Sequence, residues 1–272
     1  MLKAIYMPRG RAREYASLAL NLYNGCAHGC RYCYARGIMR RTYEDFTTNV
    51  APRDDIIRKL HRDCELLEKD ADHTPPILLC FTTDPYQPIE RDAELTREAI
   101  QTIKGHGLRF QVLTKSGVLC RRDFPLYRSG DLFAVTLTHL SAEQQRLVEP
   151  GADSPIQRIK ALRIAHEHGI QTWASLEPVL DPATALELIR LTRGFVDEYR
   201  IGTFNQGRHP VSTIDWQQFA RDAIALLLQL NKPFYIKRDL QNYLPTDERI
   251  ELSHIMRAIR HKRQERRERK RP

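Results

Sequence analysis

The stretch that decides the fold is Gly25-Cys26-Ala27-His28-Gly29-Cys30-Arg31-Tyr32-Cys33-Tyr34, which places three cysteines within eight residues. The other three cysteines of the 272-residue chain, Cys64, Cys80 and Cys120, are scattered. In a chain without a secretory segment, a dense cluster of cysteines indicates metal binding rather than disulfide bonds. The spacing C-x3-C-x2-C can hold three irons of a four-iron cluster, and it leaves the fourth iron open.

Zinc is the competing interpretation of this cluster, because His28 would complete a tetrahedral site of three cysteines and one histidine. A gap of three residues followed by a gap of two is not the usual paired spacing of zinc knuckles. No second Cys or His pair follows at the distance that zinc motifs use. The pattern therefore favours iron and sulfide.

Composition excludes several classes of protein. The chain is 42% hydrophobic and 28% charged, which supports a full-sized core and is not typical of a disordered chain or a disulfide-stapled mini-protein. No apolar run approaches the roughly 18 residues of a membrane helix. Residues 1–15 carry basic side chains without an apolar core after them, unlike a secretory signal. We predict a cytoplasmic protein without a membrane partner.

The net charge of +9 is concentrated at the C-terminus. Residues 257–272 contain nine Lys or Arg and two Glu, a charge of +7, which leaves only +2 for the rest of the chain. Such a run indicates contact with nucleic acid, and the alternative is a solvated helix end that aids solubility. We therefore divide the chain into a main domain, residues 1–245, and a basic C-terminal helix or tail, residues 246–272.

Apolar runs alternate with helical patterns along the main domain. The predicted strands are residues 17–23, 77–83, 109–114, 132–138, 171–176, 198–204 and 234–236, and the predicted helices are residues 52–68, 92–104, 154–168, 183–195 and 215–230. Alternation of this kind predicts an α/β fold with a parallel sheet. We expect a partial (β/α) barrel of about six parallel strands.

Polar residues follow the predicted strands where each one ends. They are Thr82-Thr83-Asp84, Thr114-Lys115-Ser116, Thr136 and Thr138, Ser175 and Glu177, and Thr203 and Asn205. The carboxyl ends of barrel strands form the active face of such folds. Together with the cysteine cluster, these polar ends predict one site.

These residues resemble a known family. The spacing C-x3-C-x-aromatic-C, with Tyr32 at the aromatic position, is the signature of the radical SAM superfamily. Three further motifs follow in order, Thr82-Thr83-Asp84-Pro85-Tyr86-Gln87-Pro88, Leu113-Thr114-Lys115-Ser116 and Glu149-Pro150-Gly151. Over residues 17–205 the chain resembles the spore photoproduct lyase-like branch of that superfamily.

The resemblance implies a 4Fe-4S cluster and S-adenosylmethionine (SAM) as cofactors, with an electron donor such as flavodoxin or ferredoxin. The reduced cluster cleaves SAM to a 5′-deoxyadenosyl radical, which abstracts a hydrogen from substrate. The implied metal ligands are Cys26, Cys30 and Cys33. The implied SAM-binding residues are Tyr32 at the adenine, Thr82, Thr83 and Asp84 at the methionine amino group, Lys115 at the carboxylate, Thr136 at the ribose or carboxylate, and Glu177 and Asn205 at later strand ends.

Some of these roles compete with structural ones. Lys115 follows a buried strand and needs an anionic partner, whereas Asp84 could equally cap the turn before Pro85. Tyr34 matches a tyrosine on the radical path of spore photoproduct lyase. Tyr86 could stack a substrate base or donate a hydrogen, or it could only stiffen its loop.

The chain departs from the lyase at its hydrogen-donating cysteine. Alignment on Asp84 puts Phe81 at that position, and Cys80 lies one residue earlier, on the opposite face of a strand. The lyase reaction itself is therefore in doubt.

Two functions follow from the sequence. The first is a radical SAM enzyme that acts on DNA or RNA, for repair or modification; because the main domain is almost neutral, a peptide or small-molecule substrate is the alternative. The second is a nucleic-acid-binding protein whose cluster is structural or redox-sensing and supports no turnover. Arg31, Arg36, Arg40 and Arg41 near the cluster support a nucleic-acid partner, and the polar strand ends favour the enzyme.

Overall fold

The computed structural model describes residues 2–204 and 214–268, without the side chains of residues 260 and 262–268. The chain divides into two compact units. Unit 1 comprises Met1–Thr136 and Leu140–Thr172, and unit 2 comprises Leu137–His139 and Trp173–Pro272.

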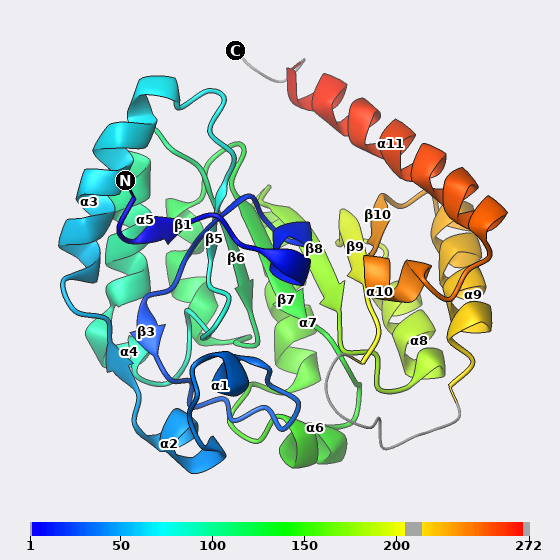
Figure 1. Ribbon diagram of the computed structural model, residues 1–272, viewed down its shortest axis with the longest axis horizontal. Helices are drawn as coiled ribbons and strands as arrows, with labels where there is room; N and C mark the ends of the chain where they lie inside the picture. The colour runs from blue at the N-terminus through cyan, green and yellow to red at the C-terminus, as the bar shows by residue number, and fades with distance from the viewer. Residues whose placement is uncertain (1, 205–213, 269–272) are drawn as a thin grey trace. The chain divides into compact units, whose positions relative to one another are not determined.

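Unit 1 is built on a mostly parallel sheet in the order β1-β2-β5-β6-β7 (Figure 1). Its strands are β1 (Ile5–Tyr6), β2 (Leu18–Leu20), β5 (Ile77–Leu79), β6 (Phe110–Thr114) and β7 (Leu132–Thr136). Strand β1 pairs antiparallel to β2, and the later pairs are parallel. Strands β5 and β7 are buried throughout, as expected of a parallel sheet covered on both faces. A separate pair joins β3 (Tyr23–Asn24) to β4 (Ala51–Pro52).

Helices follow the strands of unit 1. They are η1 (Gly10–Glu14), α1 (Ala35–Ile38), α2 (Tyr43–Thr48), α3 (Ile56–Leu67), η2 (Glu68–Asp70), α4 (Glu90–Ala93), α5 (Leu95–Gly105), η3 (Leu119–Leu126), α6 (Ala142–Val148) and α7 (Pro155–Glu167). The start of α7 is encoded locally, because the Ser154 side chain accepts from Gln157 N–H and Pro155 occupies the first turn. Helices α3 and α5 pack against each other.

A buried carboxylate attaches the N-terminus to unit 1. Asp63, on α3, is only 1% exposed and accepts backbone N–H groups from Lys3, Ala4 and Ile5 at 2.7–2.9 Å. Edge strand β1 was not expected from the sequence, since its two residues are too short to form a recognisable pattern.

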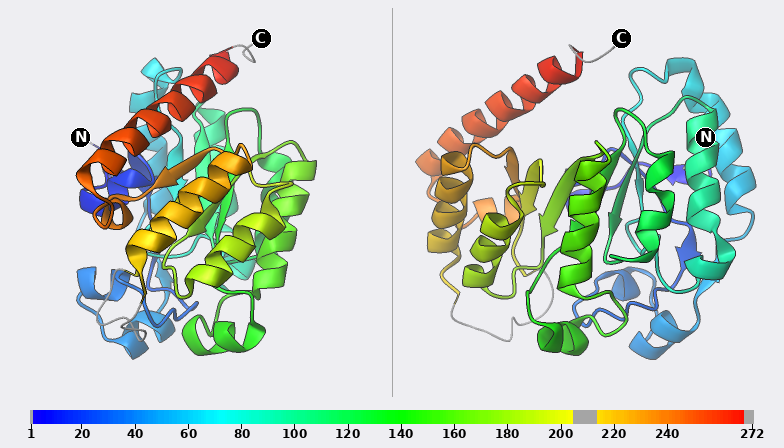
Figure 2. Two further views of the ribbon diagram at one scale, coloured as in Figure 1. Left: turned by 90° about the vertical axis from the view of Figure 1, so that its right-hand side faces the viewer. Right: turned by 180° about the vertical axis from the view of Figure 1, so that it is seen from behind.

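Unit 2 contains the parallel strands β8 (Gln171–Leu176, from Trp173 on), β9 (Glu198–Ile201) and β10 (Phe234–Ile236). Its helices are α8 (Pro182–Thr192), α9 (Trp216–Gln229), α10 (Arg238–Gln241) and α11 (Thr246–Glu268). Figure 2 shows α8 and α9 side by side within this unit. Among the described residues, no helix is long and apolar enough to cross a membrane.

The α/β fold class with parallel strands is confirmed, and the differences lie at the strand ends. Residues 77–83 and 198–204 were expected to be extended, yet β5 ends at Leu79 and β9 ends at Ile201. Beyond these ends the side chain of Asp84 accepts from Thr114, and the hydroxyl of Thr203 donates to Asp239. The division at residues 245 and 246 stays a prediction.

Candidate functional site

The three clustered cysteines lie in the cysteine loop, residues 25–34, between β3 and the first turn of α1. Two helices anchor this loop through its backbone. The N–H of Cys26 donates to the Phe46 carbonyl of α2 at 2.9 Å, and the N–H of Arg31 donates to the Val148 carbonyl of α6 at 2.8 Å. The loop is therefore fixed near both ends.

Gln87 holds the first half of the cysteine loop from the segment after β5. Its side chain is fully buried. The amide oxygen accepts the N–H of Ala27 at 2.8 Å, and the amide nitrogen donates to the carbonyl of Gly25 at 3.3 Å. One side chain thus satisfies two loop groups that would otherwise be unpaired.

The turn Glu149-Pro150-Gly151 closes on the other side of the loop. The N–H of Gly151 donates to the His28 carbonyl at 2.9 Å. A Cβ atom at Gly151 would lie 2.1 Å from the carbonyl oxygen of Ala27. Only glycine allows this close approach of the two backbones.

The cysteines themselves are sheltered and form no disulfide. Cys26 and Cys30 are 9% and 8% exposed, and Cys33 is half-buried. Burial raises the pKa of the Cys26 thiol well above its usual value and that of Cys30 to about 12. Binding to a metal would deprotonate such thiols outright.

The arrangement differs from a site for one metal ion. Among the residues that the structure describes, no three His, Cys, Asp or Glu side chains converge as the ligands of a single ion do. In a four-iron cluster each cysteine binds its own iron, so the sulfurs stand farther apart. His28, the fourth ligand in the zinc interpretation, lies 3.3 Å from a carboxylate oxygen of Asp84.

Tyr32 is tied to a buried ion pair. Its hydroxyl donates to one carboxylate oxygen of Glu149, and Arg158 binds the other at 2.5 Å. Glu149 and Arg158 are 0% and 1% exposed. Burial, followed by the charge of Glu149, raises the pKa of Tyr32 well above its usual value. The tyrosine is therefore a neutral donor at ordinary pH.

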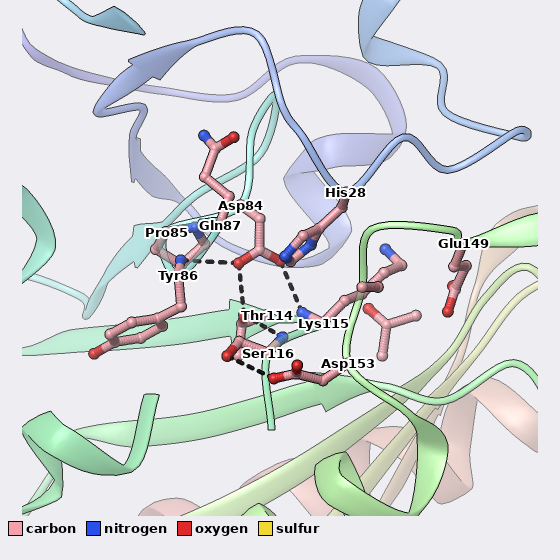
Figure 3. Close-up of polar contacts among 12 residues, drawn as sticks. His28, Asp84, Pro85, Tyr86, Gln87, Thr114, Lys115, Ser116, Glu149 and Asp153 are labelled. Atoms are coloured by element: carbon pink, nitrogen blue, oxygen red, sulfur yellow. Dashed lines mark hydrogen bonds and ion pairs between the residues drawn. The ribbon is translucent and has the colours of Figure 1, made fainter. Parts of the chain in front are cut away.

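Asp84 organises the ends of β5 and β6 (Figure 3). Its Oδ1 accepts the N–H of Tyr86 at 2.9 Å and the hydroxyl of Thr114 at 2.6 Å, and its Oδ2 accepts the N–H of Lys115 at 2.7 Å. Burial acts to raise the pKa of Asp84, but His28 and these donors lower it to about 2. Such contacts match the turn-capping interpretation, and a contact with the SAM amino group stays a prediction.

Lys115 presents a cation next to the cysteine loop. The residue is half-buried, and its ammonium lies 5.6 Å from the centroid of the Tyr32 ring. Burial acts to lower the pKa of Lys115, but Cys30 and Glu149 raise it more. Among the described residues, its ammonium makes neither an ion pair nor a hydrogen bond with protein. An anionic ligand would supply that missing partner.

One hydroxyl group after β5 lacks a hydrogen-bond partner within the described part of the chain. It is the Oγ1 atom of Thr82, which is buried, whereas the side chain of the neighbouring Thr83 contacts Cys80. Buried polar atoms in proteins are almost always hydrogen-bonded. The Thr82 hydroxyl is therefore available to a polar group of a ligand, and the SAM contacts of Thr82 and Thr83 stay predictions.

The other residues that the sequence predicts to bind SAM are Thr136, Glu177 and Asn205. Thr136 ends β7, and its carbonyl accepts from Arg158 at 3.0 Å. Glu177, in unit 2, pairs with Lys237, a partner that the sequence did not suggest. Asn205 lies outside the described residues.

Tyr34 lies at the surface of the same loop. It is 38% exposed, and its hydroxyl donates to the Phe81 carbonyl at 3.1 Å. Strand β5 ends at Leu79, so the alternation of strand faces does not apply to Cys80 and Phe81. Cys80 is buried, and the Phe81 ring packs on Tyr15 with centroids 5.7 Å apart.

Tyr86 occupies a different environment from the other predicted residues. It is 2% exposed, and its hydroxyl donates to buried Asp123 at 3.1 Å. Its ring points away from His28 and Lys115 (Figure 3). This packing matches a structural role for Tyr86 better than a contact with substrate.

Sequence reasoning missed the residues that support the loop. Gln87 and Glu149 stood inside quoted motifs, yet nothing in a motif says which side chain points inward. The sequence did not single out Arg158, because it is one of several charged residues along the pattern of α7. The one clue was that its charge falls at a position of this helix that faces the core.

Comparison with known proteins decides the family. The sequence model of the Radical SAM superfamily matches residues 20–187, more than half of the chain. The chain belongs to the Radical SAM superfamily. It is accordingly a radical SAM enzyme, and the cofactors of this superfamily are a 4Fe-4S cluster and SAM.

Two of the relatives in sequence are uncharacterized proteins of different organisms. The uncharacterized protein MJ0683 of Methanocaldococcus jannaschii is 28% identical over 191 residues, covering 68% of this chain and 69% of that protein. The uncharacterized protein Rv2578c of Mycobacterium tuberculosis is 30% identical over 178 residues, covering 61% of this chain and 50% of that protein. The chain thus spans only half the length of its mycobacterial relative.

Solved structures of two radical SAM proteins share the fold. A spore photoproduct lyase variant with bound SAM and a dinucleoside spore photoproduct has a TM-score of 0.62 at 15% identity, over 85% of this chain and 78% of that one. Streptococcus suis SuiB bound to SAM has a TM-score of 0.61 at 10% identity, over 80% of this chain and 50% of that one. At these identities the likeness concerns the fold alone.

Proposed function

We propose that the cysteine loop holds a 4Fe-4S cluster through Cys26, Cys30 and Cys33, and that SAM binds beside it on unit 1. Three sheltered thiols in one anchored loop fit the cluster, and the buried Thr82 hydroxyl, which has no hydrogen-bond partner among the described residues, fits a polar group of SAM. When bound, the cluster supplies the electron that cleaves SAM to a 5′-deoxyadenosyl radical, which abstracts hydrogen from substrate.

The single observation that carries this proposal is the ammonium of Lys115. It lies 5.6 Å from the centroid of the Tyr32 ring, beside Cys30, and lacks an anionic partner among the described residues. Glu149 favours the charged form of Lys115 from a distance, and a carboxylate ligand would add the direct ion pair that the ammonium lacks among the described residues. In this proposal Lys115 binds the SAM carboxylate, while Tyr32 packs against the adenine.

The other residues of the site position these groups. Glu149 accepts from the Tyr32 hydroxyl and so limits rotation of the ring. Asp84 accepts the backbone N–H of Lys115 and so fixes where its side chain begins. Thr82 and Thr83 offer hydroxyls to the SAM amino group. Tyr34, on the exposed side of the loop, is proposed to relay a hydrogen atom between SAM and substrate.

The substrate in this proposal is DNA or RNA. The support is the basic run of residues 257–272 and the arginines that follow the cysteine loop. An enzyme that acts on flipped or single-stranded bases needs a basic surface for the phosphates and aromatic side chains on which the bases stack. Whether the outcome is repair or modification depends on the hydrogen donor, because Phe81 replaces the donating cysteine of the lyase.

The first experiment tests the enzyme. The protein is reconstituted anaerobically with iron and sulfide, reduced in the presence of SAM, and assayed for 5′-deoxyadenosine. We expect product from the natural chain and none from Cys30→Ala. An intact cluster that yields no product, with or without oligonucleotide, would contradict the proposal.

The Lys115→Ala variant tests the carboxylate contact. Loss of one partner of a desolvated charge pair costs about 2–5 kcal/mol, so we expect the affinity for SAM to fall by about 100-fold. Calorimetric titration of SAM into the reconstituted protein measures this. Exposed Lys69 supplies the matched control Lys69→Ala, and equal affinities of the two variants would remove Lys115 from the site.

A further inference from the structure

Two arginines, one within the cysteine loop and one just after it, lie close to the same tyrosine ring. The guanidinium carbon of Arg31 lies 4.5 Å from the centroid of the Tyr43 ring, and that of Arg36 lies 5.9 Å from it. Arg31 sits between two of the clustered cysteines, Arg36 lies on α1, and Tyr43 begins α2. We call these three residues the arginine pair and its ring.

Neither guanidinium has an acidic partner among the described residues. Within that part of the chain, Arg31 and Arg36 make no ion pair and no side-chain hydrogen bond. Of the nearest acids along the chain, Asp45 pairs with Arg41, and Glu44 pairs with neither member of the pair. Residues 31–41 contain four arginines and no Asp or Glu.

Stacking on the ring leaves the hydrogen-bonding capacity of both arginines unused. A cation–π contact engages the face of a guanidinium and contributes about 0.5–1 kcal/mol at an exposed site. The five N–H donors lie in the plane of the group and stay available for a ligand. Two like charges near one ring repel each other, and a bound anion reduces that repulsion.

The ring is mounted rigidly on the cysteine loop. The hydroxyl of Tyr43 donates to the Gly29 carbonyl at 2.8 Å, and Gly29 has a φ of +60° that disfavours any side chain there. The backbone N–H of Arg31 donates to Val148 at 2.8 Å. An anion bound by the pair is therefore held in a constant position relative to the cysteines.

From this geometry we infer that Arg31 and Arg36 bind a phosphodiester group of a single-stranded nucleic acid, which places the strand beside the cluster. Planar guanidinium groups bind phosphate oxygens in a bidentate manner. The inference rests on the proposed function, since it names where that substrate is held. It goes beyond it by naming Arg31 and Arg36 as the residues that hold a phosphodiester beside the cysteines, in addition to any contact made by the C-terminal run.

The test uses the full reconstituted chain and a fluorescein-labelled single-stranded oligonucleotide. Anisotropy titrations at several salt concentrations compare the natural chain with Arg31→Gln/Arg36→Gln. We expect at least a tenfold loss of affinity, and a salt slope smaller by about 0.7 for each lost phosphate contact. The control is Arg62→Gln/Arg91→Gln, two exposed arginines of unit 1 with the same change of charge.

A second variant separates binding from folding. Arg31→Lys/Arg36→Lys keeps both charges but loses the planar donors, so we expect it to restore most of the salt slope and only part of the affinity. Iron content and the circular dichroism spectrum of each variant report whether the loop still forms.

The outcomes separate the two ideas. If the natural chain binds the oligonucleotide and the pair variant binds it as well as the control does, the inference is wrong while the proposed substrate class stands. If the natural chain binds no oligonucleotide, both are wrong, and formation of 5′-deoxyadenosine would still support the enzyme itself. A selective loss in the pair variant supports the inference.

Discussion

The carboxylate of Glu149 is fully buried between a cation and a phenol. One oxygen accepts from Tyr32, and the other binds Arg158, which is itself 1% exposed. Removing one member of a buried pair leaves an uncompensated charge and costs about 3–5 kcal/mol. The ion pair therefore holds Tyr32 in place, and in the proposed function it supports the SAM site without contacting SAM.

We expect Glu149→Gln to lower the melting temperature of the protein by roughly 10 °C, since each kcal/mol shifts it by about 2–4 °C in a chain of this size. Differential scanning calorimetry measures this, with exposed Glu143→Gln on α6 as the control. The double variant Glu149→Gln/Arg158→Met should recover much of the loss, because the unpaired cation is gone. A single variant as stable as the control would show that the ion pair contributes little.

At the same scale, the sequence indicated the candidate site residues but not the residues that support them. The spacing of Cys26, Cys30 and Cys33 and the position of Lys115 after a strand were visible in the chain. The contacts of Gln87 and Glu149 were not, because they join residues 60 and 117 positions apart in sequence. Tyr86 is the opposite case: its position in a motif made it a candidate site residue, but a motif does not reveal that the side chain faces the core.

Among the elements, the start of β7 depends on an aspartate with an unusual pKa. Asp131 is 1% exposed and accepts the N–H of Phe110 at 3.0 Å and that of Arg128 at 2.9 Å. Burial raises the pKa of Asp131 to about 6, and these two bonds only reduce the effect. Its folded-state pKa thus lies above its unfolded value of 3.8.

A raised carboxyl pKa means that the contribution of Asp131 to stability is complete below about pH 4 and is lost as the pH rises through about 6. Asp131→Asn removes this titration, but it also loses one of the two backbone hydrogen bonds, because an amide nitrogen cannot accept. We therefore expect the natural chain to be more stable than Asp131→Asn at pH 4.5, and this advantage to fall by up to about 3 kcal/mol as the pH rises to 8. Thermal melts across this range, beside exposed Asp92→Asn, check it, and a stability difference that does not depend on pH would contradict it.

Elements with long periodic patterns were predicted well, and short ones were not. Helices α7 and α9 match their expected ranges within one residue at each end, because capping residues and the spacing of apolar residues mark them. Strand β1 and helix α1 have two and four residues. Segments of that length bury too little of one face to leave a pattern, and tertiary contacts such as those of Asp63 decide them.

Charge is unevenly distributed along the whole chain, and its most basic part begins within helix α11. The helix spans Thr246–Glu268, and Leu252, 2% exposed, attaches its first half to unit 2. Residues 257–272, with a charge of +7, follow that attachment. They can therefore be removed without exposing the buried leucine.

We expect deletion of residues 257–272 to weaken binding of a single-stranded oligonucleotide and to reduce its salt dependence by about 0.7 per lost phosphate contact. Formation of 5′-deoxyadenosine should continue, because the cysteine loop lies in unit 1. A chain of full length with the nine basic residues changed to Gln controls for length. Unchanged affinity and slope would assign this run to solubility alone.

The supports of the cysteine loop bear on how the proposed cluster would be lost and replaced. Gln87, α2, α6 and the close approach of Gly151 hold the loop through protein groups. None of these contacts involves a cysteine sulfur, so loss of the proposed cluster to oxygen would leave all of them in place. We therefore expect the oxidised protein to stay folded and to accept a new cluster from iron and sulfide.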